Sequence, residues 1–186
     1  MSSQKVLDVG GADGSRAKRH FPNAKIKTLD LINGYDVMKK GLPIGDWDII
    51  FANHIIEHVL SPDFLLDECK RVMSTKTVLE IGTPNLAAWF NRILFLFGYV
   101  PHSVELSRRF NVGKAFNWND EPLGGHIYVY TVPAILQLLK HHGFKILSVK
   151  GEASTYPAHP IIMWVDKLLT CLSPNLASAV RIKCTI

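Results

Sequence analysis

Two acidic residues, and the small residues that follow the first of them, have the types and spacing that point most directly to chemistry. Asp8 lies near the end of an apolar run and is followed by small residues at every second position, Gly10, Ala12 and Gly14. Asp30 comes 22 positions after Asp8 (30 − 8) and closes a second strand-like run. Small residues let a backbone approach a ligand closely, and a carboxylate placed like Asp30 can accept hydrogen bonds from ribose hydroxyls. The pattern indicates a site for an adenosine-containing cofactor.

The spacing of the small residues separates this site from two common nucleotide sites. A dinucleotide fingerprint that began at Gly10 would need glycine at positions 12 and 15, where the chain has Ala12 and Ser15. A phosphate-binding P-loop needs a lysine after its glycines, and none follows here. The turn therefore favours a different adenosine cofactor.

The elements that position these residues are predicted from hydrophobic periodicity and from helix start and stop signals. Strands are expected at residues 5–9, 25–30, 49–52, 77–81, 144–149 and 179–186. Helices are expected at residues 13–20, from 61–62 onward, at 86–97 after Asn85, from Thr131 to Gly143, and at 161–172. Strands that alternate with helices predict an α/β fold with a doubly wound, mostly parallel sheet.

Length and composition fit one globular domain. The 186 residues are 47% apolar and 20% charged, so we expect a single domain over residues 1–186, with an insertion or lid at about 84–125. The apolar runs are too short to span a bilayer, and no secretory signal precedes the first strand. The three cysteines match no metal or disulfide spacing. We therefore expect a cytoplasmic protein without a membrane span.

Several motifs together resemble a known family. The pattern from Asp8 to Gly14 resembles motif I of class I S-adenosylmethionine-dependent methyltransferases, with Ala12 in place of the usual middle glycine. Segments 52–59, 82–85 and 125–144 resemble later motifs of the subfamily that methylates small molecules, known as methyltransferase types 11 and 23. The motifs cover residues 5–150 in the order that the family uses. The resemblance implies a Rossmann-like sheet of seven strands in the order 3-2-1-4-5-7-6, with an antiparallel last strand.

The resemblance also implies S-adenosyl-L-methionine as the cofactor. Asp30 would bind the ribose hydroxyls, Asp36 would lie near the adenine amine, and the start of the first helix would suit the cofactor's carboxylate. The cofactor-binding residues implied by the motifs are Asp8, Gly10, Gly11, Ala12, Gly14, Asp30, Leu31, Asp36, Val37, Asn53 and His54. For Asp30 and Asp36 the alternative is a turn residue at the end of an element.

Methyl transfer from a sulfonium mainly requires that donor and acceptor be held close and aligned. A hydroxyl acceptor is helped by a general base, for which the candidates are His58, Glu57 and His126, with His54 nearby. The alternatives are a buried histidine for His58 and a loop histidine that positions the next helix for His126. A metal held by Glu57 and His58 is conceivable, but two adjacent residues are a poor ligand set, so no metal is predicted.

The acceptor is expected to be a small molecule with an apolar part, methylated on oxygen or nitrogen. Residues 89–99 are nearly all apolar and are predicted to form a substrate lid or a homodimer surface within segment 84–125, with core packing as the alternative. The net charge of +5 raises a nucleic-acid or protein methyltransferase as a second hypothesis. Residues 53–56 read Asn-His-Ile-Ile, not the [DN]-P-P-[FYW] of many nucleic-acid enzymes, so nucleic acid is not expected. The third hypothesis is a non-catalytic binding protein that has kept the methyltransferase fold.

Overall fold

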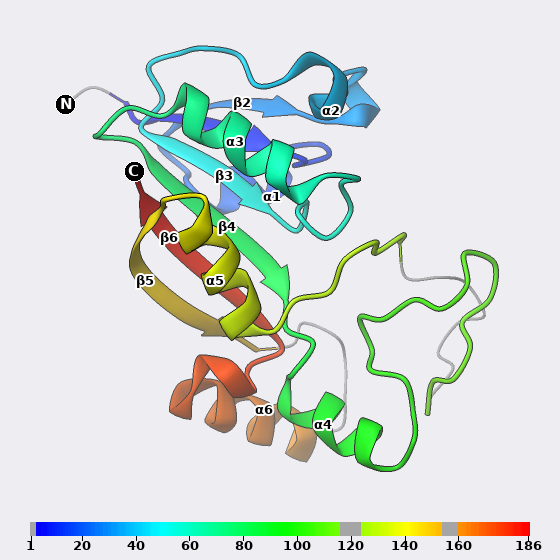
Figure 1. The fold of residues 1–186 in the computed structure, drawn as a ribbon. Helices are drawn as coiled ribbons and strands as arrows, with labels where there is room; N and C mark the ends of the chain where they lie inside the picture. The colour runs from blue at the N-terminus through cyan, green and yellow to red at the C-terminus, as the bar shows by residue number, and fades with distance from the viewer. Residues whose placement is uncertain (1–2, 116–123, 154–159) are drawn as a thin grey trace.

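A computed structural model describes residues 3–115, 124–153 and 160–186 (Figure 1). One mixed sheet runs through the molecule in the order β2-β1-β3-β4-β6-β5. Its strands are β1 (Lys5–Val9), β2 (Lys25–Leu29), β3 (Ile49–Asn53), β4 (Val78–Pro84), β5 (Lys145–Glu152) and β6 (Ala179–Thr185). The first four strands are parallel, and β6 is antiparallel to both β4 and β5. The predicted fold class and the antiparallel last strand are confirmed.

The sheet has six strands in the described part of the chain rather than the predicted seven. The observed order equals the predicted one without the edge strand that would lie beside β2. The chain instead forms a short 3-10 helix (Leu31–Asn33) and α2 (Val37–Lys40), and it then runs to β3 without regular structure. Pro43 and Gly45 lie in that last stretch. Proline lacks a donor and glycine is flexible, so both disfavour a strand there.

Helices cover the two faces of the sheet unequally. The remaining helices are α1 (Ser15–His20), α3 (Pro62–Val72), α4 (Trp89–Leu96), α5 (Val132–His141) and α6 (Pro160–Leu172), and a 3-10 helix spans Pro174–Leu176. In Figure 1, α3 and α5 lie on one face, α1 lies on the other, and α4 and α6 lie together at one end. No helix in the described ranges is long and apolar enough to cross a membrane.

The start signals of α3 and α5 are confirmed. The Ser61 hydroxyl accepts a hydrogen bond from the Phe64 N–H at 3.2 Å, and the Thr131 hydroxyl accepts one from the Ala134 N–H at 3.3 Å. Both helices bury an apolar stripe against the sheet, which includes Leu65, Leu66 and Cys69 of α3 and Ile135 and Leu139 of α5. Burial of such a stripe is the main source of helix stability in a globular domain.

The predicted starts of two other helices are wrong. Helix α1 begins at Ser15 rather than at Asp13, because Gly14 has a φ of 73° and Asp13 accepts a hydrogen bond from the Ser15 N–H. Helix α4 begins at Trp89 rather than directly after Asn85. The side-chain amide of Asn85 donates to the carbonyls of Ala177 and Asn175, at 2.9 and 3.1 Å. This side chain therefore holds the start of the insertion against the chain that precedes β6.

The turn between β1 and α1 has left-handed backbone at three alternate positions. The φ angles are 71° at Gly10, 50° at Ala12 and 73° at Gly14. A Cβ on Gly10 would lie 2.4 Å from the side chain of Ile55, so only glycine fits there. Ala12 is exposed, and its N–H donates to the Asp30 carboxylate at 2.9 Å. The alanine is therefore accommodated, at the cost of a strained backbone conformation.

Relief of that strain gives a first prediction. Replacing Ala12 by glycine should raise the free energy of unfolding by about 0.5–1 kcal/mol, because the left-handed penalty for alanine exceeds the entropy that glycine loses on folding. Urea unfolding measures the difference. The matched control is Ala134→Gly on the exposed face of α5, which should lower stability by about 1 kcal/mol. Equal destabilisation by both substitutions would contradict the assigned backbone strain.

A charged clamp between α5 and α3 gives a second prediction. His142 follows α5, and its two ring nitrogens lie 2.9 Å from Asp67 and 2.9 Å from Asp63 of α3. Burial alone would lower the pKa of His142, but the hydrogen bonds to both carboxylates outweigh it, so the pKa is raised above 6.5. The clamp should therefore be fully present below the ordinary histidine pKa and be lost as the pH rises through the folded-state pKa.

Urea midpoints across this pH range test the clamp. We expect the wild type to lose stability as the pH rises above the ordinary histidine pKa. The variant with both Asp63→Asn and Asp67→Asn should lose much of this pH dependence, since neutral amides no longer favour the imidazolium. The same slope in both proteins would show that the clamp contributes nothing.

Candidate functional site

The carboxyl ends of the first three parallel strands bring predicted residues to one edge of the sheet. Asp8 lies in β1, Asp30 directly follows β2, and Asn53 ends β3. Ligands of open α/β sheets bind at this edge, because the strand ends leave a crevice between the loops that follow them. The turn that contains Gly10 lies against Ile55, in the loop after β3, so the connections that follow β1 and β3 form one surface.

Asp30 is held rigidly and still has room for a ligand. One carboxylate oxygen accepts the Ala12 N–H at 2.9 Å, and the other accepts the Ile32 N–H at 2.9 Å. An ionised carboxylate offers about four lone-pair sites, so about two remain after these bonds. The side chain is partly exposed at the sheet edge. The remaining lone pairs could accept hydrogen bonds from the two hydroxyls of a ribose.

Asp8 supports the turn from beneath. Its side chain is buried and accepts a hydrogen bond from the Thr28 hydroxyl at 3.1 Å. A Cβ on Gly11 would lie 1.9 Å from its carboxylate, and one on Gly14 would lie 2.5 Å from the Thr28 hydroxyl. Burial raises the pKa of Asp8 to about 6, although the Thr28 hydrogen bond opposes the shift. Asp8 therefore packs against the buried side of the turn and leaves no room there for a side chain at position 11.

The other three residues that the motifs place near the adenosine have different environments. Leu31 is 71% exposed beside Asp30, as an apolar contact for a planar base would require. The Asp36 carboxylate caps α2 through the Met38 N–H at 3.0 Å. Val37 is buried in the core, so only its backbone is available to a ligand.

The end of β3 carries an unpaired polar group and a second strained residue. The Asn53 side-chain oxygen is buried and has no hydrogen-bond partner among the described residues. It lies 2.0 Å from where a Cβ on Gly82 would be, which explains glycine at that position of β4. His54 has a φ of 57°, a conformation that is costly for a residue with a side chain. Strain and unpaired polar atoms are concentrated at binding sites.

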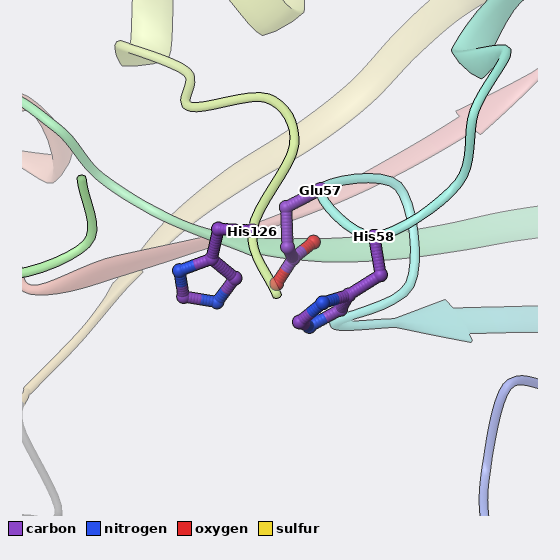
Figure 2. A group of neighbouring side chains, drawn as sticks. All are labelled: Glu57, His58 and His126. Carbon is purple, nitrogen blue, oxygen red and sulfur yellow. The ribbon is translucent and has the colours of Figure 1, made fainter. Parts of the chain in front are cut away.

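The three predicted catalytic candidates lie together. Glu57 and His58 come from the loop after β3, and His126 comes from the segment before α5 (Figure 2). One donor atom from each of the three lies within 4.8 Å of the others. Figure 2 shows the Glu57 carboxylate between the two rings. Such a set could move a proton or hold a divalent ion. The expectation from the sequence that no metal binds here stays a prediction.

Backbone pairing joins these two segments. The Glu57 carbonyl accepts hydrogen bonds from the N–H groups of Ile127 and Tyr128, at 2.8 and 3.1 Å. The rings of His58 and His126 are 4.7 Å apart between centroids. The pairing fixes the relative position of side chains that are far apart in the sequence, and no local sequence signal could have predicted it.

Hydrogen bonds assign the protonation of the histidines. The Nδ1 of His126 lies 2.9 Å from the Ser103 carbonyl, which can only accept, so Nδ1 carries the hydrogen and Nε2 is free to accept a proton. The Nδ1 of His54 lies 3.1 Å from the Glu57 carboxylate, which also accepts from the Thr83 hydroxyl at 3.2 Å. Each oxygen of the buried Glu57 carboxylate thus already has a hydrogen-bond partner, whereas the His126 Nε2 has none among the described residues.

A cleft of about 250 Å³ lies beside His126. It is lined by residues of two segments, Glu105, Leu106, Ser107, Arg108, Gly125, His126 and Ile127. The Glu105 carboxylate joins the two walls, since it accepts the Gly125 and His126 N–H groups at 3.0–3.3 Å. The sequence prediction missed Glu105 and Ser103, because both lie in a stretch without periodicity.

Lys114 closes the loop that carries one wall of the cleft. Its ammonium donates to the carbonyls of Pro101, His102 and Val104 at 2.5–2.9 Å. The Val100 N–H also donates to the Gly113 carbonyl at 2.7 Å. Burial lowers the pKa of Lys114, and the Glu105 carboxylate opposes the shift. The wall is therefore a closed loop with its own internal hydrogen bonds.

Comparisons with known proteins agree with this geometry. The profile of the methyltransferase domain family matches residues 2–149. No functionally curated protein matches significantly. An S-adenosylmethionine-dependent methyltransferase from Mesorhizobium loti has a TM-score of 0.63 at 14% identity, covering 100% of this chain and 92% of that chain. One from Archaeoglobus fulgidus has a TM-score of 0.56 at 14% identity, covering 100% of this chain and 87% of that chain.

A third similar structure carries ligands. The O-methyltransferase NcsB1 from neocarzinostatin biosynthesis, solved with S-adenosylmethionine and 2-hydroxy-5-methyl naphthoic acid, has a TM-score of 0.53 at 13% identity. The match covers 97% of this chain and 48% of that chain. At these identities the structural likenesses establish the fold, and the family profile, which spans well over half of the chain, establishes the family. The chain therefore belongs to the methyltransferase domain family and is a class I S-adenosylmethionine-dependent methyltransferase.

Proposed function

We propose that this enzyme transfers a methyl group from S-adenosylmethionine to an oxygen or nitrogen of a small acceptor that has an apolar part. The observation that carries the proposal is the small, partly apolar cleft that His126 lines, since the Nε2 of this histidine has no hydrogen-bond partner among the described residues. Leu106 and Ile127 supply apolar walls, while Ser107 and Arg108 supply polar ones. A cleft that combines apolar side chains with polar groups can hold a small acceptor by its apolar part and orient its reacting atom.

The residues at the sheet edge fit the cofactor. Asp30 would accept hydrogen bonds from the ribose hydroxyls, and Leu31 would contact the adenine. The turn would let the backbone approach the cofactor, because Gly10 and Gly11 carry no side chains. When bound, S-adenosylmethionine supplies an activated methyl group on its sulfonium. The chain's own task is then to align the acceptor with that group and to exclude water.

His126 is proposed as the general base. Its Nδ1–H is bonded to the Ser103 carbonyl, so Nε2 can take the proton that a hydroxyl or ammonium acceptor must lose. Glu57 is proposed as a positioning residue, since its carboxylate is already bonded to His54 and Thr83. His58 packs against His126 and limits the tilt of its ring. Segment 84–125 is proposed as the part of the chain that covers the acceptor.

The ribose contact is tested by cofactor affinity. Asp30→Asn should weaken S-adenosylmethionine binding by about 10- to 100-fold in calorimetric titration, because charge-assisted hydrogen bonds to ribose are each worth about 1.5–3 kcal/mol. Asp46→Asn, an exposed acid at a different loop, should leave affinity unchanged. Unaltered affinity in Asp30→Asn would refute the contact. Absence of binding to the wild type at millimolar cofactor would favour a non-catalytic binding protein.

The role of His126 is tested with a panel of small phenols and amines and labelled cofactor. His126→Asn keeps a donor for the Ser103 carbonyl but removes Nε2, so kcat should fall by about 10²–10⁴-fold, the usual contribution of a general base. Cofactor affinity should stay within about twofold, because His126 is not assigned a cofactor contact. His141→Asn on α5 is the control, since that histidine is exposed and lies away from the cleft.

Two further results bear on this assignment. A kcat for His126→Asn equal to that of the wild type would remove His126 from catalysis. Activity should also survive a chelator, because the proposed role is proton transfer; loss of activity that added metal restores would instead assign Glu57, His58 and His126 as metal ligands.

A further inference from the structure

Helices α4 and α6 each bury a polar side chain and expose large apolar side chains. In each helix the single buried residue is polar: Asn91 in α4 and Asp166 in α6. Helices α3 and α5 have the opposite arrangement, with apolar side chains in the core. We propose that α4 and α6 together bind the surface of a lipid bilayer that contains anionic lipids.

The apolar surface of α4 is concentrated at its C-terminal end. Phe95 is 71%, Leu96 is 80% and Phe97 is 71% exposed, and Tyr99 follows them with 45% exposed. Core packing, the alternative considered from the sequence, is therefore wrong for these side chains. The helix is held instead by Asn91, which accepts the His102 N–H at 2.9 Å. Large exposed apolar patches are uncommon on proteins that contact only water.

Helix α6 adds a second apolar surface at the same end of the molecule. Four large side chains lie at helical spacing along it and are 45–69% exposed, Ile161, Trp164, Leu168 and Leu172. The Asp166 carboxylate on the buried side accepts hydrogen bonds from the Trp89 indole at 2.8 Å and from the Ser178 hydroxyl at 3.0 Å. Trp89 belongs to α4, so this bond sets the two helices side by side, as Figure 1 also shows.

The exposed charges of α4 and α6 themselves are positive. The two helices contain three charged residues, and the only acid among them, Asp166, is buried and bonded. Lys167 is exposed, Arg92 is exposed while its guanidinium donates to the Ala87 and Asn175 carbonyls at 2.7 and 3.2 Å, and Arg108 and Arg109 are exposed in the loop that follows α4. Apolar side chains beside exposed basic residues are the composition of helices that lie in the interface of an anionic membrane.

The same charges argue against a second copy of the chain as the partner. A two-fold interface would bring each patch against itself, and the basic residues would then face their own kind. Acidic lipid headgroups would instead pair with Lys167 while the apolar side chains enter the acyl region. A contact between the helices and lipid thus satisfies both the apolar and the charged groups. The inference does not depend on which acceptor the enzyme uses.

Vesicle flotation with the full chain tests the proposal. The protein should bind vesicles of phosphatidylcholine mixed with phosphatidylglycerol more tightly than vesicles of phosphatidylcholine alone. Leu96→Asp and Trp164→Asp should each weaken this binding by about tenfold or more, because each removes one large apolar contact and adds a carboxylate. Ile44→Asp is the matched control, since Ile44 is 83% exposed on a different loop, and it should bind like the wild type.

Two more measurements keep the result decisive. Lys167→Gln should weaken binding to the anionic vesicles by about fivefold and leave binding to neutral vesicles unchanged. Leu96→Ser and Trp164→Ser repeat the test without a new charge, and thermal unfolding verifies that each variant is folded. Absence of vesicle binding by the wild type, or equal loss in Ile44→Asp, would overturn the proposal. The proposal would also be overturned if sedimentation without vesicles showed a wild-type dimer and if Leu96→Ser and Trp164→Ser abolished that dimer.

Discussion

The candidate active site depends on one pair of backbone hydrogen bonds, from Ile127 and Tyr128 to the carbonyl of Glu57. They join the loop after β3 to the segment before α5, two stretches separated by about seventy residues of chain. They set the His126 segment beside the loop that carries His58, and the bonds of His126 to the Ser103 carbonyl and the Glu105 carboxylate then fix its position against the other wall of the cleft. Main-chain bonds of this kind do not depend on side-chain identity, so the two segments can vary in sequence while the geometry persists.

Local signals predicted the fold well and the site in part. The strand runs, the Ser61 and Thr131 caps and the alternating small residues act within a few positions, and each formed the element expected of it. Asn85 behaved differently because its amide finds carbonyls some ninety residues away, and a sequence pattern cannot weigh such a partner against a helix cap. Ser103, Glu105 and Lys114 were missed for the same reason, since folding alone brings the Ser103 carbonyl to the His126 ring and the side chains of Glu105 and Lys114 to their backbone partners.

Ala12 was the residue of the turn that departs from the family pattern, and the structure explains why it can. Ala12 is exposed, so its side chain meets no other part of the protein that would exclude it, and its backbone groups are bonded to Asp30 and Asn33. The two positions before it are stricter. Gly10 is fixed by Ile55, and Gly11 is fixed by the buried carboxylate of Asp8. The requirement for glycine in this turn is therefore set by what lies against each Cα.

The two main-chain bonds that hold Asp30 have a consequence for affinity. A carboxylate that is free to rotate loses side-chain entropy when a ligand captures it, and that loss weakens binding. Here the rotamer is selected by the fold, before any ligand arrives. The lone pairs that remain on the Asp30 oxygens already point in fixed directions, so a sugar bound as proposed would meet a rigid template that does not have to rearrange around it.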